Sequence, residues 1–180
     1  MKSDIRTLTI SAIIGAVYAV LTVVLAPISY GALQFRVSEA LCIMPYFFPG
    51  TAWGLFAGCF IANLMTGNVF DIIFGSLATL CAGLLTGYFG RRPEMRGSKI
   101  MACMMPVLFN AIVVGAVITT AYNGMNILLH PGVFLLNALQ VGLGEAGVLF
   151  LLGLPLMHYL PQKFWFRDYM EKLYHERRAS

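Results

Sequence analysis

Charged side chains are scarce in this sequence, since Asp, Glu, Lys and Arg together make up only 11% of its 180 residues. A soluble domain usually carries about a quarter charged residues. Hydrophobic residues account for 59% of the chain, and the mean hydropathy is +0.78. This composition excludes a water-soluble globular domain. It predicts an all-α integral membrane protein, because a helix satisfies its backbone hydrogen bonds internally within the bilayer.

Motifs for several kinds of chemistry are also missing. The sequence contains no G-x-x-x-x-G-K-[ST] phosphate-binding loop, no H-E-x-x-H and no G-x-S-x-G. Its four cysteines lie in apolar segments without C-x-x-C spacing, which indicates free thiols rather than a metal site. We therefore expect no metal, no cofactor and no enzymatic activity. The net charge of +4 comes from the loops and the tail, which suits an anionic membrane surface and does not indicate nucleic acid.

Apolar runs divide the chain into six segments separated by turn residues and polar loops. A membrane-spanning helix needs about 20 residues. The segments are expected to form one membrane domain over residues 1–180, with six transmembrane helices at about 7–26, 36–48, 52–65, 71–90, 99–121 and 133–160. Residues 161–180 mix aromatic with basic side chains, which predicts an interfacial helix on the cytoplasmic surface.

Basic residues predict how these helices are oriented. Eleven of the twelve Lys and Arg residues lie before the first segment, between the fourth and fifth, or after the sixth. Cationic loops resist translocation, so all three clusters, and therefore both termini, are expected in the cytoplasm. Arg36 alone is left on the outer side. A basic residue that departs from the rule indicates a functional site.

Three acidic residues, Glu39, Asp71 and Glu145, lie at or within the predicted helices. A charge at the bilayer centre costs about 2.5–3.5 kcal/mol on insertion scales. Glu145 shares a helical face with Asn137 and Gln140, which is the pattern of a binding site. The alternative is a protonated Glu145 bonded to a neighbouring helix. Asp71 follows a Gly-Asn turn, so it either caps a helix or contacts a ligand.

Other polar residues leave two interpretations open. Arg36 and Glu39 are one helical turn apart, so they either pair with each other or line an outward pocket. Asn63 and Asn110 are single amides in apolar helices, which either form interhelical hydrogen bonds or contact a ligand.

Small residues indicate where helices pack closely. Ala12, Gly15, Ala16 and Ala19 recur at i, i+3, i+4 and i+7 in the first segment, so this face is expected to contact either another helix or another protein. Glycines at fourfold spacing in the third and fourth segments, such as Gly54 and Gly58, indicate packing inside the chain.

Four sequence runs together carry a resemblance to a known family. They are residues 33–41 (LQFRVSEAL), 54–64 (GLFAGCFIANL), 71–80 (DIIFGSLATL) and 142–145 (GLGE). The first run is the most specific, and the similarity covers nearly the whole chain. The sequence resembles the QueT group of substrate-binding S components of energy-coupling-factor (ECF) transporters.

This resemblance implies an S-component bundle of six helices in the bacterial cell membrane. It implies that Ala12 and Ala16 form an A-x-x-x-A motif that docks a membrane scaffold subunit, which joins two cytoplasmic ATPases. Gly15 and Ala19 are expected on the same docking face. It also implies a lid after the first helix, with Arg36 at its base, and a protein that topples to release its substrate inward. Membrane lipid surrounds the bundle, and no nucleic acid partner is implied.

The implied substrate is a 7-deazaguanine base, such as queuine or a prequeuosine base. Its two adjacent N–H donors match a carboxylate, supplied by Glu145 or Glu39, and the amides of Asn137 or Gln140 suit its ring carbonyl. Aromatic side chains stack on the ring, for which Tyr30, Phe35 and Phe70 are candidates. The expected substrate-binding residues are Glu145, Gln140, Asn137, Glu39, Arg36, Asp71, Asn63, Phe35 and Phe70.

Two other functions remain open at this point. One is an S component for another vitamin-like solute. The other is a small integral membrane enzyme that acts on a lipid-linked substrate, in which buried acids would be catalytic.

Overall fold

The computed structural model describes residues 5–30 and 34–179, with side chains up to Lys172. Within these ranges the chain is helical and contains no strand, which confirms the all-α class. The elements are α1 (Ile5–Val24), α2 (Ala26–Ser29), η1 (Val37–Ile43), α3 (Met44–Phe47), α4 (Thr51–Asn63), η2 (Leu64–Thr66), η3 (Asp71–Gly75), α5 (Ser76–Gly90), α6 (Ser98–Val117), η4 (Ile118–Tyr122), α7 (Pro131–Val148), η5 (Leu149–Gly153), α8 (Leu154–Tyr159), η6 (Leu160–Gln162) and α9 (Phe164–Ala179).

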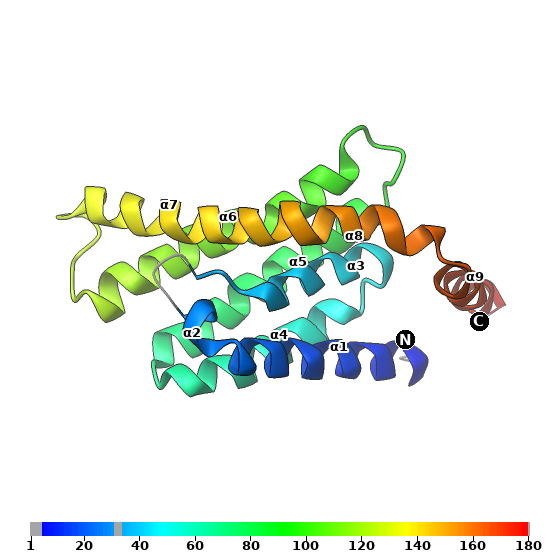
Figure 1. The fold of residues 1–180 in the computed structure, drawn as a ribbon, viewed down its shortest axis with the longest axis horizontal. Coiled ribbons are helices and arrows are strands. Elements are labelled where there is room, and N and C mark those ends of the chain that lie inside the picture. The colour runs from blue at the N-terminus through cyan, green and yellow to red at the C-terminus, as the bar shows by residue number, and fades with distance from the viewer. Residues whose placement is uncertain (1–4, 31–33, 180) are drawn as a thin grey trace.

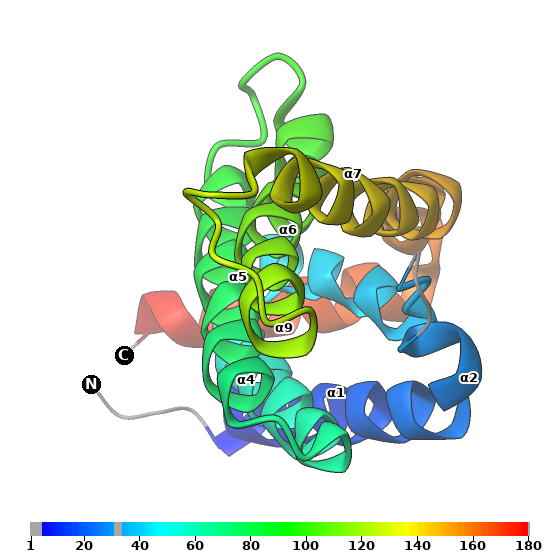
Figure 2. The same cartoon turned by 90° about the vertical axis from the view of Figure 1, so that its left-hand side faces the viewer.

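The helices form an elongated bundle. In Figure 1, α1 and α4 run along one side and α7 with α8 along the other, while α3, α5 and α6 lie between them. Helix α1 begins and α9 ends at the same end of the bundle (Figure 1). Helix α9 lies across the long axis at this end (Figure 1), and its position at a membrane surface stays a prediction. Figure 2 views the bundle from the opposite end, where the connection between α6 and α7 lies.

Four continuous helices are long and apolar enough to cross a membrane. They are Ile5–Val24, Asp71–Gly90, Ser98–Tyr122 and Pro131–Gln162. The other two expected segments form the shorter apolar helices Val37–Phe47 and Thr51–Thr66. Proline explains part of this shortening, because Pro49 follows the end of α3 and has no backbone N–H to donate to the helix ladder, whereas Pro45 lies in the first turn of α3, where proline is tolerated. The count of six membrane crossings therefore stays a prediction.

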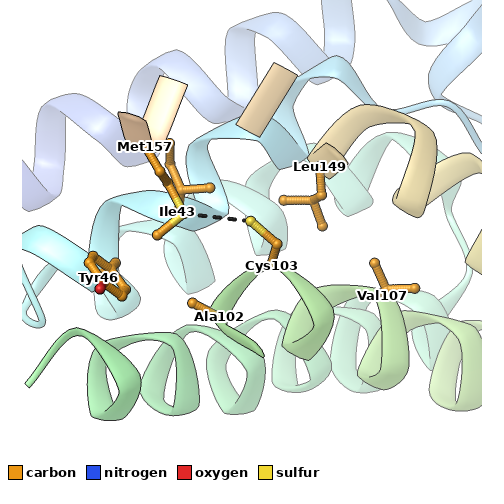
Figure 3. Packing of buried hydrophobic residues seen from close by; sticks show 7 residues of the cluster. All are labelled: Ile43, Tyr46, Ala102, Cys103, Val107, Leu149 and Met157. Atoms are coloured by element: carbon orange, nitrogen blue, oxygen red, sulfur yellow. Dashed lines mark hydrogen bonds between the residues drawn. The ribbon is translucent and has the colours of Figure 1, made fainter. Parts of the chain in front are cut away.

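A buried apolar cluster joins the middle elements to α8. Figure 3 shows side chains from α3, α6 and η5 pointing toward one another, with Cys103 Sγ 3.5 Å from Met157 Sδ. The buried members are Ile43, Tyr46, Ala102, Cys103, Val107, Leu149 and Met157. This cluster lies toward the end of the bundle where α9 is found.

Helices α1 and α4 approach each other at glycines. A Cβ atom added to Gly54 would collide with the backbone oxygen of Ser11, and one added to Gly58 would collide with the oxygen of Gly15. This confirms the predicted internal packing of the glycines in α4. Backbone contact of this kind needs small residues on both helices.

The expected stripe of small residues on α1 is divided by this packing. Gly15 and Ala19 are buried, Gly15 directly against α4, whereas Ala12 and Ala16 are exposed. The expectation that all four residues form one docking face therefore needs correction. Residues spaced i, i+3, i+4 and i+7 cover a wide arc of the helix at about 100° per residue. One neighbouring helix covers only part of that arc.

We predict that Gly54→Ala destabilises the fold by about 1–3 kcal/mol, because the added methyl group meets rigid backbone rather than a mobile side chain. Thermal unfolding of the purified protein in detergent measures this effect. Gly132→Ala is the matched control, since a Cβ at Gly132 meets no atom within 4 Å. Equal stability of the two variants would contradict the close packing of α1 against α4.

Candidate functional site

A cavity of about 460 Å³ is lined by residues of elements that meet near the end of the bundle facing the viewer in Figure 2. It lies among α7, the connection from α4 to α5, the end of α6 and the segment after α2. Its lining residues come from parts of the sequence that are far apart: Tyr30, Gln34, Met65, Thr66, Asp71, Ile118, Tyr122, Asn137 and Gln140. The lining combines amides, hydroxyls and one carboxylate with apolar surface, which is typical of a small-molecule site.

Irregular helical turns supply much of this lining. Asp71 begins the π-helical turn η3, and Ile118 and Tyr122 are the first and last residues of the π-helical turn η4. Met65 and Thr66 belong to the 3₁₀ turn η2, which ends at Gly67 with φ +65°. Irregular backbone at membrane depth is tolerated where it lines a cavity, and π turns are frequent at functional sites.

Asp71 is held between the cavity and α4. Its residue is only 3% exposed, and its Oδ1 atom is buried without a hydrogen-bond partner. The Nδ2 atom of Asn63 donates to the backbone oxygen of Asp71 at 3.1 Å, so this hydrogen bond ties α4 to the first residue of η3. The helical segment already includes Val69 and Phe70, and the Phe70 N–H donates to Asn68 Oδ1 at 3.0 Å, so Asn68 rather than Asp71 caps it.

Asn137 and Gln140 reach the cavity from α7. Thr119 Oγ1 donates to the Gly115 carbonyl at 2.8 Å, so it accepts the hydrogen bond from Asn137 Nδ2 at 2.9 Å. This pair of bonds sets the orientation of the Asn137 amide and leaves its carbonyl oxygen as a hydrogen-bond acceptor. Gln140, one turn further along α7, adds a second amide to the same wall.

Arg36 lies behind the cavity wall instead of on it. The guanidinium carbon is 5.3 Å from the centre of the Tyr30 ring, and Nε is 3.4 Å from the Ser29 carbonyl oxygen. Its Nη2 atom is buried without a partner. Tyr30 in turn donates from its hydroxyl to the Ala62 carbonyl at 2.7 Å, which ties the segment after α2 to α4. Gln34 completes this side of the cavity with a positive φ of 45°.

The other two acids are engaged inside the bundle. Glu39 accepts a short hydrogen bond from the hydroxyl of Tyr18 and a contact from Cys42 Sγ at 2.9 Å. Glu145 Oε1 accepts from Asn110 Nδ2 at 2.6 Å, and its Oε2 is buried without a partner. Neither residue is part of the cavity lining.

The structure therefore brings together three of the predicted binding residues, Asp71, Asn137 and Gln140. It places Glu39, Arg36, Asn63 and Glu145 in the surrounding interior. The two predicted phenylalanines lie outside the lining, where Phe35 contacts the Gly147 position and Phe70, 56% exposed, stacks with Phe74.

Several lining residues were not among the predicted ones. Thr66 and Tyr122 lie at helix ends next to Gly-Asn and Asn-Gly turns, where a hydroxyl or an aromatic ring is ordinary in a membrane protein. Met65 and Ile118 are apolar residues in apolar helices, and Gln34 lies in a loop. The turn residues beside Thr66 and Tyr122 indicate that helices end there, and nothing in the sequence indicates that these two ends meet.

Comparison with known proteins identifies the family. A family model described as QueT transporter matches residues 8–162. The chain is also 38% identical over 81 residues to the queuosine precursor transporter QueT of Lactococcus lactis subsp. cremoris (strain MG1363). That match covers 44% of this chain and 48% of the relative, so the chain spans about half of the relative's length. No solved structure matches the chain.

The family match extends over most of the 180 residues and includes every lining residue of the cavity. Together with the long apolar helices, it indicates a multi-pass protein of the bacterial cell membrane. This confirms the expected resemblance and argues against an enzyme. The chain belongs to the QueT transporter family.

Proposed function

We propose that this chain is the substrate-binding subunit of an ECF-type importer that takes up queuosine precursors through an outward-facing cavity. The polar cavity at one end of an otherwise apolar bundle carries this proposal. The family match and the name of the Lactococcus lactis relative support the substrate class.

The cavity suits a flat, polar heterocycle. Its volume of about 460 Å³ falls within the range of roughly 300–1,000 Å³ that is usual for small-molecule sites. A 7-deazaguanine base offers N–H donors and a carbonyl acceptor on one edge, which amide side chains can match. Asn137 and Gln140 provide these amides, and the rings of Tyr30 and Tyr122 provide surfaces on which a base can stack.

The proposed orientation has six membrane crossings, both termini in the cytoplasm and the cavity outside. Helix α1 begins and α9 ends at one end of the bundle, and the basic loop at residues 91–97 lies toward that end (Figure 1). Positive charge of this kind is retained in the cytoplasm. Helix Thr51–Thr66 would reach about 24 Å at 1.5 Å per residue, which is a short crossing.

We predict that a cysteine at exposed position Asn126 reacts with an impermeant maleimide added outside cells, because the α6–α7 connection would face outward. A cysteine at Arg96 should react only after the membrane is opened. The unsubstituted protein, in which three of the four native cysteines are buried, gives the background labelling. Labelling of Arg96→Cys in intact cells would contradict this orientation.

We predict that the purified protein binds queuine in a calorimetric titration, whereas riboflavin, thiamine and biotin produce no binding heat. The three vitamins carry donor and acceptor groups in arrangements that differ from the edge of a deazaguanine, so the panel tests the substrate class directly. Binding of a different vitamin in place of every deazaguanine would favour an S component for another solute. Binding of none would contradict the proposed role of the cavity.

The energy for uptake would come from partner subunits, because the sequence lacks a phosphate-binding loop for ATP. Ala12 and Ala16 form an exposed strip of small side chains on α1, which is called a ridge below. Small residues permit close approach by another membrane helix. We propose this ridge as the surface that docks the scaffold subunit, which would carry two ATPases.

We predict that the double variant Ala12→Leu and Ala16→Leu binds queuine normally but abolishes ATP-driven uptake in cells that contain the scaffold and ATPases. The larger side chains would keep the scaffold helix at a distance. Cys81→Leu is the control, because it enlarges an exposed small residue on α5 instead. Co-purification of the double variant with the scaffold at the wild-type level would contradict this docking surface.

A further inference from the structure

Asp71 is the only residue with a charged side chain among the described residues that line the cavity. The residue is only 3% exposed, and its Oδ1 atom is buried beside Gly75 without a hydrogen-bond partner, so little of the carboxylate is open to the cavity. Within the described part of the chain, no Lys, Arg or His nitrogen lies within 4.0 Å of the Asp71 carboxylate. Arg36 attracts this carboxylate from a distance without contacting it, and a buried carboxylate that no cation contacts is costly, so a cation supplied by a ligand would be favoured beside it.

Nearby charges do not neutralise this carboxylate by direct contact. The charged residues buried in the described interior are three acids and one base, Glu39, Asp71, Glu145 and Arg36. Arg36 packs on the Tyr30 ring and contacts the Ser29 carbonyl, while Glu39 and Glu145 accept hydrogen bonds from other side chains. Carboxylates thus exceed guanidinium groups around the cavity, and only Asp71 presents one at its surface.

The amides of the cavity lie on a different wall from this carboxylate. Asn137 and Gln140 belong to α7, whereas Asp71 begins η3 at the connection from α4 to α5. In both Figure 1 and Figure 2, α7 lies above α4, with the ribbons of other helices between them. A ligand in the cavity can therefore present one edge to the amides and a substituent to Asp71.

We propose that Asp71 selects deazaguanine bases that carry a protonated amine on their 7-substituent, while Asn137 and Gln140 bind the edge of the base. This inference rests on the proposed function and adds which member of the substrate class binds best. An alkylamine is protonated near pH 7. Its ammonium group would form a charge-assisted hydrogen bond with Asp71, which is roughly twice as strong as a neutral one.

Two ligands of similar size test this proposal. 7-Aminomethyl-7-deazaguanine carries a cationic amine, whereas 7-cyano-7-deazaguanine has a neutral nitrile on the same ring. Calorimetric titration of the unsubstituted protein should give about 10- to 100-fold tighter binding of the aminomethyl base. Equal affinity for the two bases would overturn the proposal while leaving the proposed function intact. Failure of both bases to bind would overturn the proposed function as well.

Two variants separate the roles of the two walls. Asp71→Asn should lose most of its affinity for the aminomethyl base and keep its affinity for the cyano base. Gln140→Leu should weaken both bases by the same factor, because the two share the ring edge. The control Asp168→Asn removes an exposed carboxylate on α9 and should change neither affinity. Equal weakening of both bases by Asp71→Asn would overturn the proposal, because Asp71 would then bind the ring.

Discussion

The burial of ionisable side chains in a chain this apolar is the constraint on which the rest of the structure depends. Each buried charge or amide must find a partner, since water is excluded from the bundle interior. Glu39 is engaged by Tyr18 and Cys42, and Glu145 by Asn110. Asp71 differs from both in its position, because it is the one of these three acids that lines the cavity. The site is thus the place where the interior leaves a polar group for a ligand.

Close helix packing and irregular backbone act together to place that group. The glycine contacts draw α1 and α4 together, and Tyr30 ties the segment after α2 to Ala62 near the end of α4. Beyond that point the regular helices give way to 3₁₀ and π turns, which open the backbone at Asp71. The same packing covers Gly15 and leaves Ala12 exposed, so one helix has both an internal face and a surface available to a partner.

Composition and hydropathy were sufficient to predict a helical membrane protein, because these signals accumulate over whole segments. Predicting where the cavity lies requires the position of each residue along its helix as well as the helix face on which it lies. Glu145 shares a face with Asn137, but it lies eight residues further along α7, which is about 12 Å at 1.5 Å per residue. Periodicity correctly placed the residues on one stripe and could not show where the cavity along that stripe ends.

The Arg36–Glu39 pair shows a second limit of sequence patterns. An i, i+3 pair forms only when both residues lie in the helix, and Arg36 precedes η1 in an extended conformation with ψ 98°. Its side chain therefore turns toward Tyr30. The place of Met65 and Ile118 in the cavity lining could not be predicted for another reason. Nothing in the sequence of an apolar helix distinguishes a residue that faces a cavity from one that faces lipid.

A structure of the protein with a bound deazaguanine tests the central claim most directly. The account predicts density for the base between α7 and η3, within hydrogen-bond distance of Asn137 or Gln140 and with its 7-substituent directed toward Asp71. A base bound beside Glu145 and Asn110, or outside the cavity altogether, would contradict it.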